Sequence, residues 1–193
     1  MERGYTVLDF DYRGSSGFGR DYRTDVYRAM GEVDIDGAVT AVDWLVENEG
    51  IDRGRVGIYG LSVGGYFTLM ALFRHPGVFA AGIANVGPTD WAHDSEWPTP
   101  ILNLPHEDPE AYRRASPIYH SEALEDPLLI VHGMLDDNVH LQDAIRLVQR
   151  LIEQNREFET MYYPVEEHVI ANEDGRFDYT RRLVDFFDRH LRR

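Results

Sequence analysis

The 193-residue chain contains no cysteine and no lysine, and its 19 basic residues are all arginine. The lack of cysteine excludes disulfides, thiolate metal ligands and a cysteine nucleophile, although it leaves the cellular compartment open. The lack of lysine excludes a phosphate-binding loop of the Walker type. The glycine-rich string GSSGFG at 14–19 also departs from the spacing of a dinucleotide-binding fingerprint. We therefore expect neither thiol chemistry nor a bound nucleotide.

Positive charge is scarce, because 34 acidic residues outnumber the basic ones and give a formal net charge of −15. Nucleic acids and anionic membranes both require a positive surface, so neither is expected as a partner. No apolar run is long enough to span a membrane. The first residues lack the features of a secretory signal, which favours a cytoplasmic location. A longer precursor would leave a periplasmic or secreted location open.

Hydrophobic residues make up 43% of the chain, which is enough for the core of one globular domain. Short apolar runs alternate with helical patterns, as is typical of a parallel sheet covered by helices on both faces. Strands are expected at 5–10, 55–60, 80–86, 127–133 and 158–163. Helices are expected at 33–48, 63–74, 141–154 and 177–191, the last with Phe177 on its buried face. The sequence predicts an α/β domain with a doubly wound, mostly parallel sheet.

The string YGLSVGG at 59–65 fits the pattern G-x-S-x-G around Ser62. The pattern alone is a weak signal, but here it ends an apolar strand and opens an apolar helix, the setting of a nucleophile elbow. Such a turn lifts the serine hydroxyl to the carboxyl edge of the sheet. The backbone N–H of Val63, at the helix N-terminus, can then donate to an oxyanion. The alternative is a glycine-rich turn that contains a serine by chance.

A serine nucleophile needs a base and an acid that orients the base, in the chain order Ser, Asp or Glu, His for an α/β-hydrolase. Asp136 and Asp137 both follow the expected strand 127–133 and are the candidate acids. His168 follows the last expected strand on a loop that can fold back over the sheet edge. His140 is a weaker candidate, and His190 is expected on an exposed helix face. The ordered set makes Ser62 a predicted nucleophile with His168 as its base.

Five motifs together resemble the catalytic domain of the prolyl oligopeptidase family of serine peptidases, especially the dipeptidyl and acylaminoacyl peptidase branches. They are DYRGSSGFGRDY at 11–22, GEVDIDGAVTAVDWL at 31–45, GLSVGGY at 60–66, HGMLDDNVH at 132–140 and YYPVEEH at 162–168. The resemblance implies an α/β-hydrolase fold over nearly the whole chain. Its G-x-x-D-x-x-V spacing from Gly133 to Val139 selects Asp136 over Asp137 as the acid.

The resemblance also implies a set of substrate-binding residues. The asparagine that matches Asn138 helps to hold a substrate carbonyl, and Val139 lies next to it. Aromatic residues after the third expected strand line a proline-sized pocket, which points to Trp91 and Trp97, with Trp97 the better positional match. Packing of the long, proline-rich loop at 88–120 is the alternative role for both tryptophans.

Members of the resembled family carry an oxyanion-donating strand, and often a β-propeller, before the equivalent of the segment RGYTVLDFDYRG. We therefore expect residues 1–193 to be a partial catalytic domain that lacks its early strands. A missing strand would leave a homo-oligomer, or pairing with the missing N-terminal segment, open. Val63 would share the oxyanion with a donor outside this chain.

The leading hypothesis is hydrolysis of short peptides through an acyl-enzyme on Ser62, Asp136 and His168, with no cofactor. A carboxylesterase or acylhydrolase on the same three residues is the first alternative, because the triad does not distinguish esters from amides. A non-catalytic hydrolase-fold fragment is the second. No ligand spacing in the sequence points to a metal.

Overall fold

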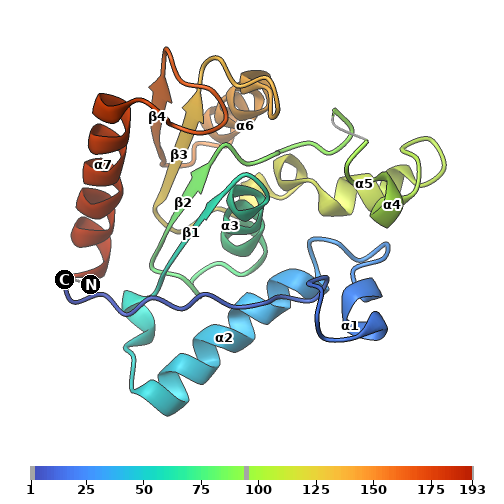
Figure 1. Ribbon diagram of the computed structural model, residues 1–193, viewed down its shortest axis with the longest axis horizontal. Coiled ribbons are helices and arrows are strands. Elements are labelled where there is room, and N and C mark those ends of the chain that lie inside the picture. Colours follow the sequence, from blue (N-terminus) through green and yellow to red (C-terminus); the bar gives the residue numbers. More distant parts are fainter. Residues whose placement is uncertain (1–2, 94–95, 193) are drawn as a thin grey trace.

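The parallel sheet is the centre of the computed structural model, which describes residues 3–93 and 96–192 (Figure 1). Within these residues the sheet has four strands in the order β1-β2-β3-β4. The strands are β1 (Gly57–Leu61), β2 (Ala81–Asn85), β3 (Leu128–Gly133) and β4 (Glu159–Tyr163). Every neighbouring pair is parallel, with Leu61 opposite Asn85 and Gly133 opposite Tyr163 at the carboxyl ends. Four of the five expected strands are thus confirmed.

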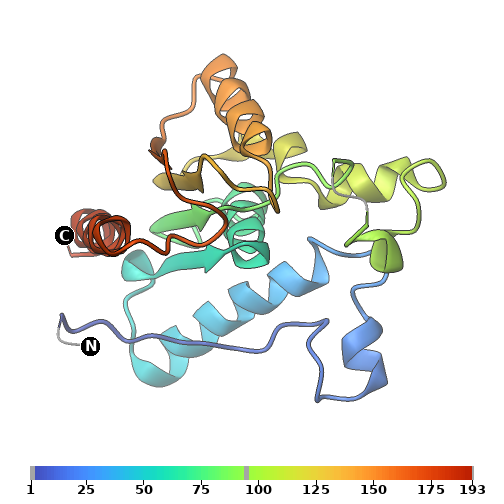
Figure 2. The same ribbon diagram turned by 45° about the horizontal axis from the view of Figure 1, so that its top comes forward.

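The helices cover both faces of the sheet, as expected for a doubly wound α/β domain. The main helices are α2 (Val33–Glu49), α3 (Val63–Arg74), α6 (Leu141–Glu153) and α7 (Glu173–Leu191). Helix α7 lies on one face and the other three lie on the opposite face (Figures 1 and 2). The expected excursion between β2 and β3 carries short helices only. These are α4 (Thr99–Leu102), α5 (Pro109–Ala115) and the 3-10 turns Pro117–Tyr119 and Ser121–Ala123, while α1 (Arg20–Thr24) and the 3-10 turn Arg53–Arg55 precede the sheet.

Alternate residues of the central strands feed two separate hydrophobic clusters. In β3, Ile130 packs in the cluster with α2, α3 and α6, whereas Leu129 and Val131 pack in the cluster with α7. This alternation follows from the two-residue side-chain period of a strand. All six residues of β3 are buried, which explains why its sequence is continuously apolar rather than alternating.

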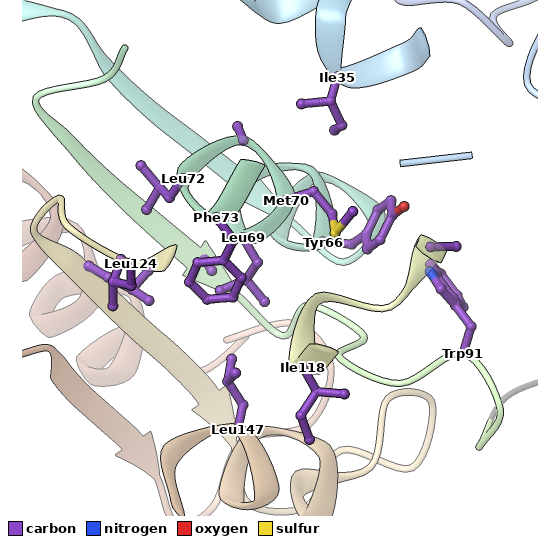
Figure 3. Packing of buried hydrophobic residues seen from close by; sticks show 14 of the residues in the cluster. Ile35, Tyr66, Leu69, Met70, Leu72, Phe73, Trp91, Ile118, Leu124 and Leu147 are labelled. Atoms are coloured by element: carbon purple, nitrogen blue, oxygen red, sulfur yellow. The ribbon is translucent and has the colours of Figure 1, made fainter. Parts of the chain in front are cut away.

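Helix α3 is the most deeply buried helix and joins the layers on its side of the sheet. Its residues Leu69, Met70 and Leu72 are at most 1% exposed. Figure 3 shows them between Ile35 of α2 and Leu147 of α6, both fully buried. Because α3 begins directly after Ser62, this packing fixes the position of the predicted nucleophile relative to the sheet.

The expected strand at 5–10 is wrong, because these residues form no strand in the structure. They run as an extended segment along α2 (Figures 1 and 2), where Phe10 comes within reach of Gly37. Val7 is 80% exposed. A strand requires a hydrogen-bonded neighbour, and within the described residues β1 pairs only with β2. Alternating apolar residues therefore favoured an extended backbone but did not supply a partner.

Phe177 is also misplaced by the sequence pattern, because it is 74% exposed rather than buried. It lies nine residues before the buried Phe186, which is two and a half turns of helix. The two side chains therefore point to opposite faces of α7. Within the described residues, no helix has both the length and the apolar character needed to cross a membrane.

Candidate active site

Ser62 lies in the sharp turn between β1 and α3, with backbone angles φ 60° and ψ −121°. A non-glycine residue rarely adopts a positive φ, so the surrounding structure must hold this turn. The Ser62 N–H donates to the carbonyl of Asn85 at 2.9 Å, and the Ser62 carbonyl accepts the N–H of Tyr66 at 3.0 Å. The expected strand–turn–helix setting is confirmed.

Two glycines permit the close approach of strand and helix at this turn. A Cβ on Gly60 would lie 2.1 Å from backbone atoms of Gly64, and a Cβ on Gly65 would lie 2.5 Å from the carbonyl oxygen of Asn85. No side chain fits at those distances. The motif thus needs glycine at these two positions for steric reasons.

The three residues predicted as nucleophile, base and acid form one hydrogen-bonded chain. His168 Nδ1 lies 2.8 Å from Asp136 Oδ2, and His168 Nε2 lies 2.9 Å from Ser62 Oγ. With an ionised carboxylate, Nδ1–H donates to Asp136 and Nε2 accepts from the serine hydroxyl. They come from three loops at the carboxyl ends of β1, β3 and β4, so the parallel sheet brings together residues 106 positions apart.

Asp136 is held from several sides. Its side chain is fully buried, whereas that of His168 is 19% exposed. Asp136 Oδ1 accepts the backbone N–H groups of Asn138 and Val139, each at 2.9 Å. These bonds occupy one oxygen and leave Oδ2 directed at His168, which fixes the orientation of the imidazole.

His132 is a further component of this loop, and it lies at the buried end of β3 as the sequence suggested. Its Nε2–H donates to the carbonyl of Val139 at 2.8 Å, and the same nitrogen lies 3.5 Å from Asp136 Oδ2. Burial lowers the pKa of His132, so the ring is neutral near pH 7. A neutral ring braces the acid loop without competing with His168 for the carboxylate charge.

Val63 begins α3, so its N–H has no acceptor within the helix and lies at the positive end of the helix dipole. Substrate oxygen could be held there. Asp137, the other candidate acid, is exposed, and so is His140. The structure thus brings together the residues of the leading hypothesis and leaves the alternative acid and base outside.

The predicted substrate-binding residues separate into two groups. Asn138 and Val139 line a cavity of about 200 Å³ together with Pro88, His93 and Asp143. Trp91 and Trp97 stack on each other with ring centroids 5.1 Å apart, but neither lines that cavity. Trp91 is 1% exposed and packs edge-on against Tyr66, as expected for a core residue. Trp97 is 47% exposed and available for contact.

A larger cavity of about 610 Å³ lies between β4 and α7, and none of Ser62, Asp136 or His168 lines it. Volume therefore does not mark the chemistry in this molecule. In the described part of the chain, no three histidine or acidic side chains are grouped as a metal ion would require.

Comparison with known proteins places this geometry in context. The model of the Prolyl oligopeptidase family matches residues 1–193. Human dipeptidyl peptidase 8 is 31% identical over 193 residues, covering 97% of this chain and 22% of that protein. The probable dipeptidyl-aminopeptidase B of Aspergillus terreus is 32% identical, covering 95% of this chain and 20% of that protein.

Solved structures give the same result. Porphyromonas gingivalis dipeptidyl peptidase 4 superimposes with a TM-score of 0.87 at 34% identity, covering 92% of this chain and 26% of that one. An acylaminoacyl peptidase in complex with Z-Gly-Gly-Phe-chloromethyl ketone gives a TM-score of 0.84 at 26% identity, covering 93% and 31%. The chain thus spans between a fifth and a third of the length of these relatives.

Proposed function

The chain belongs to the prolyl oligopeptidase family, and on that premise we propose that it hydrolyses peptide bonds of short peptides through an acyl-enzyme on Ser62. The observation that carries the proposal is the continuous hydrogen-bonded chain from Asp136 through His168 to Ser62. The peptidase names of the relatives support peptides as the substrate class.

In the first half-reaction, His168 Nε2 takes the proton of Ser62 as Oγ attacks the substrate carbonyl carbon. The resulting imidazolium is stabilised by the Asp136 carboxylate across the 2.8 Å bond. The carbonyl oxygen becomes an oxyanion, and the N–H of Val63 donates to it. The tetrahedral species collapses when the C–N bond breaks, and His168 returns the proton to the leaving amine.

In the second half-reaction, water attacks the ester formed on Ser62 while His168 takes a proton from that water. Collapse of the second tetrahedral species releases the acid and gives the proton back to Ser62 Oγ. The site has therefore returned to its starting state, with one water consumed for each bond cleaved. Asn138, Val139 and Trp97 are proposed to contact the substrate, and Trp91 to support Trp97 from behind.

Intact-mass analysis after treatment with a fluorophosphonate tests the proposal. We expect one adduct on the 193-residue chain, none on Ser62→Ala, and one on the control Ser16→Ala, whose serine is exposed and distant in sequence. No adduct on a chain that melts cooperatively would contradict the proposal.

Substrate class is then tested with aminoacyl anilides and simple aryl esters. Cleavage of both, abolished in Ser62→Ala, is the expected result. Cleavage of esters alone would favour an acylhydrolase on the same residues, because the hydrogen-bonded chain serves both reactions equally.

A further inference from the structure

Glu166 is a buried carboxylate two residues before His168, in the turn between β4 and α7. It is 4% exposed, whereas its neighbour Glu167 is exposed. A buried carboxylate lowers stability unless hydrogen bonds compensate for the lost hydration. Its position therefore requires an explanation that the proton transfers of the proposed reaction do not provide.

The side chain of Glu166 closes the loop that carries His168. Its Oε2 accepts the backbone N–H of Ala171 at 2.8 Å and that of Asn172 at 3.4 Å. Asn172 is the N-cap of α7 and accepts the N–H groups of Asp174 and Gly175 with its own side chain. The carboxylate thus lies at the positive end of a 19-residue helix, which stabilises its charge.

The other carboxylate oxygen, Oε1, is buried without a hydrogen-bond partner and faces Gly175. A Cβ on Gly175 would lie 2.5 Å from this oxygen. Glycine at this helical position therefore makes room for the carboxylate. The two residues fit each other sterically, and a change at either one moves the carboxylate.

The backbone of Glu166 contacts the other loop of the site. Its carbonyl accepts the N–H of Leu135, the residue before Asp136, at 2.9 Å. Gly133 packs so closely here that a Cβ would lie 2.6 Å from the same carbonyl oxygen. One residue thus joins the loop of the acid through its backbone and closes the loop of the base through its side chain.

We infer that Glu166 is a positioning residue that holds His168 in line between Asp136 and Ser62. The inference rests on the proposed function, since it assigns Glu166 a role in the same site. His168 lies between two anchored points of its loop, the backbone at 166 and the amide groups at 171 and 172. Without the carboxylate the second anchor is lost, and the 2.8 Å and 2.9 Å bonds of His168 lengthen together.

The first test is the rate of fluorophosphonate labelling of Glu166→Gln, measured well below the melting temperature. We expect labelling about 10- to 100-fold slower than in the wild type, because small misplacements of a reacting group have effects of this size. Glu167→Gln removes the same charge one residue away and is expected to label at the wild-type rate. Equal rates for Glu166→Gln and the wild type would overturn the inference while leaving the proposed function intact.

A second variant covers the case in which Glu166→Gln does not fold. Gly175→Ala keeps every charge and adds a better helix-forming residue, but its methyl group displaces Oε1. Slower labelling without a lower melting temperature is expected. Unchanged labelling would count against the role of the carboxylate.

The second measurement does not depend on reactivity. In proton NMR of the wild type, the His168 Nδ1–H bonded to Asp136 should give a low-field resonance that Asp136→Asn abolishes. Glu166→Gln should broaden or remove it, and Glu167→Gln should retain it. If the wild type is not labelled at all, the proposed function fails, and this resonance still decides the inference. Its absence in the wild type, or its persistence in Glu166→Gln, would overturn the role of Glu166.

Discussion

The carboxyl edge of the sheet and the N-terminal arm, residues 3–12, differ sharply in how completely they are bonded. At the sheet edge, the Asp136 side chain is fully buried with both oxygens hydrogen-bonded. In the arm, Val7 is 80% exposed, and only the ends of the arm are tied down. Tyr5 donates to Asp188 of α7, and Tyr12 packs on Phe67 of α3.

The difference shows that apolar sequence alone does not order a segment. β1 and the arm are both short and apolar, but β1 pairs with β2 along five residues. The arm has no such neighbour in the described chain. Order at the site therefore comes from backbone pairing and hydrogen bonds, which supply enthalpy that exposed side chains cannot.

The largest expected effect is at the sheet edge, in Asp136→Asn. Asparagine cannot stabilise the imidazolium and can present an N–H to the ring, so labelling by a fluorophosphonate should fall by roughly 10³–10⁴-fold. Asp137→Asn, at the exposed neighbour, should stay within about threefold of the wild type, as surface changes usually do. Similar losses in both variants would mean that the acid has been misassigned.

Gly60→Ala should break the same region through sterics. Its Cβ would lie 2.1 Å from Gly64, so we expect a loss of roughly 3 kcal/mol or more in the free energy of unfolding. At Gly64 itself a Cβ meets nothing within 4 Å, and Gly64→Ala should change stability by less than about 1 kcal/mol. Urea denaturation measures both, and a stable Gly60→Ala would disprove the tight elbow.

Asp34 lies near the point where the arm meets the core, and it connects the two regions. Burial raises the pKa of Asp34 to about 6, although backbone hydrogen bonds, including one from the N–H of Ile35, act in the opposite direction. The folded state therefore binds more protons than the unfolded state between the ordinary pKa of about 3.9 and pH 6. Wild-type stability should fall as pH rises through this window.

Asp34→Asn lacks this titration, so its stability relative to the wild type should increase between pH 4 and pH 7.5 by up to about 3 kcal/mol. Denaturant unfolding at the two pH values gives the comparison. Asp36→Asn, at a side chain that is 66% exposed on the same helix, should show a change below about 0.5 kcal/mol. A pH-independent difference for Asp34→Asn would show that the carboxyl group is not desolvated.

The smallest effect is expected in the arm. Val7→Ser removes an exposed apolar side chain and should change the free energy of unfolding by no more than about 0.5 kcal/mol. Leu147→Ala, in the core of α6, should cost about 2–5 kcal/mol in the same assay. A large loss in Val7→Ser would indicate that the middle of the arm is packed in solution, and the contrast between the regions would disappear.

The sequence by itself determined the α/β class, four of the strands and the three residues that meet at the sheet edge. These predictions succeeded because they rest on local information. Strand and helix periods are visible within a few residues, and the elbow around Ser62 is a contiguous motif. The chain order of Asp136 and His168, with parallel strands ending at one edge, was enough to expect their meeting.

Only the tertiary structure decided which partners these elements have. The segment at 5–10 has the pattern of a strand, but pairing depends on a neighbour that its own sequence does not specify. Phe177 has the composition of a core residue, but the position of α7 on the sheet sets which face is buried. Glu166 looks like an ordinary loop carboxylate until folding places it beside Ala171 and the start of α7. In each case the deciding contacts involve backbone groups, whose positions only the folded chain defines.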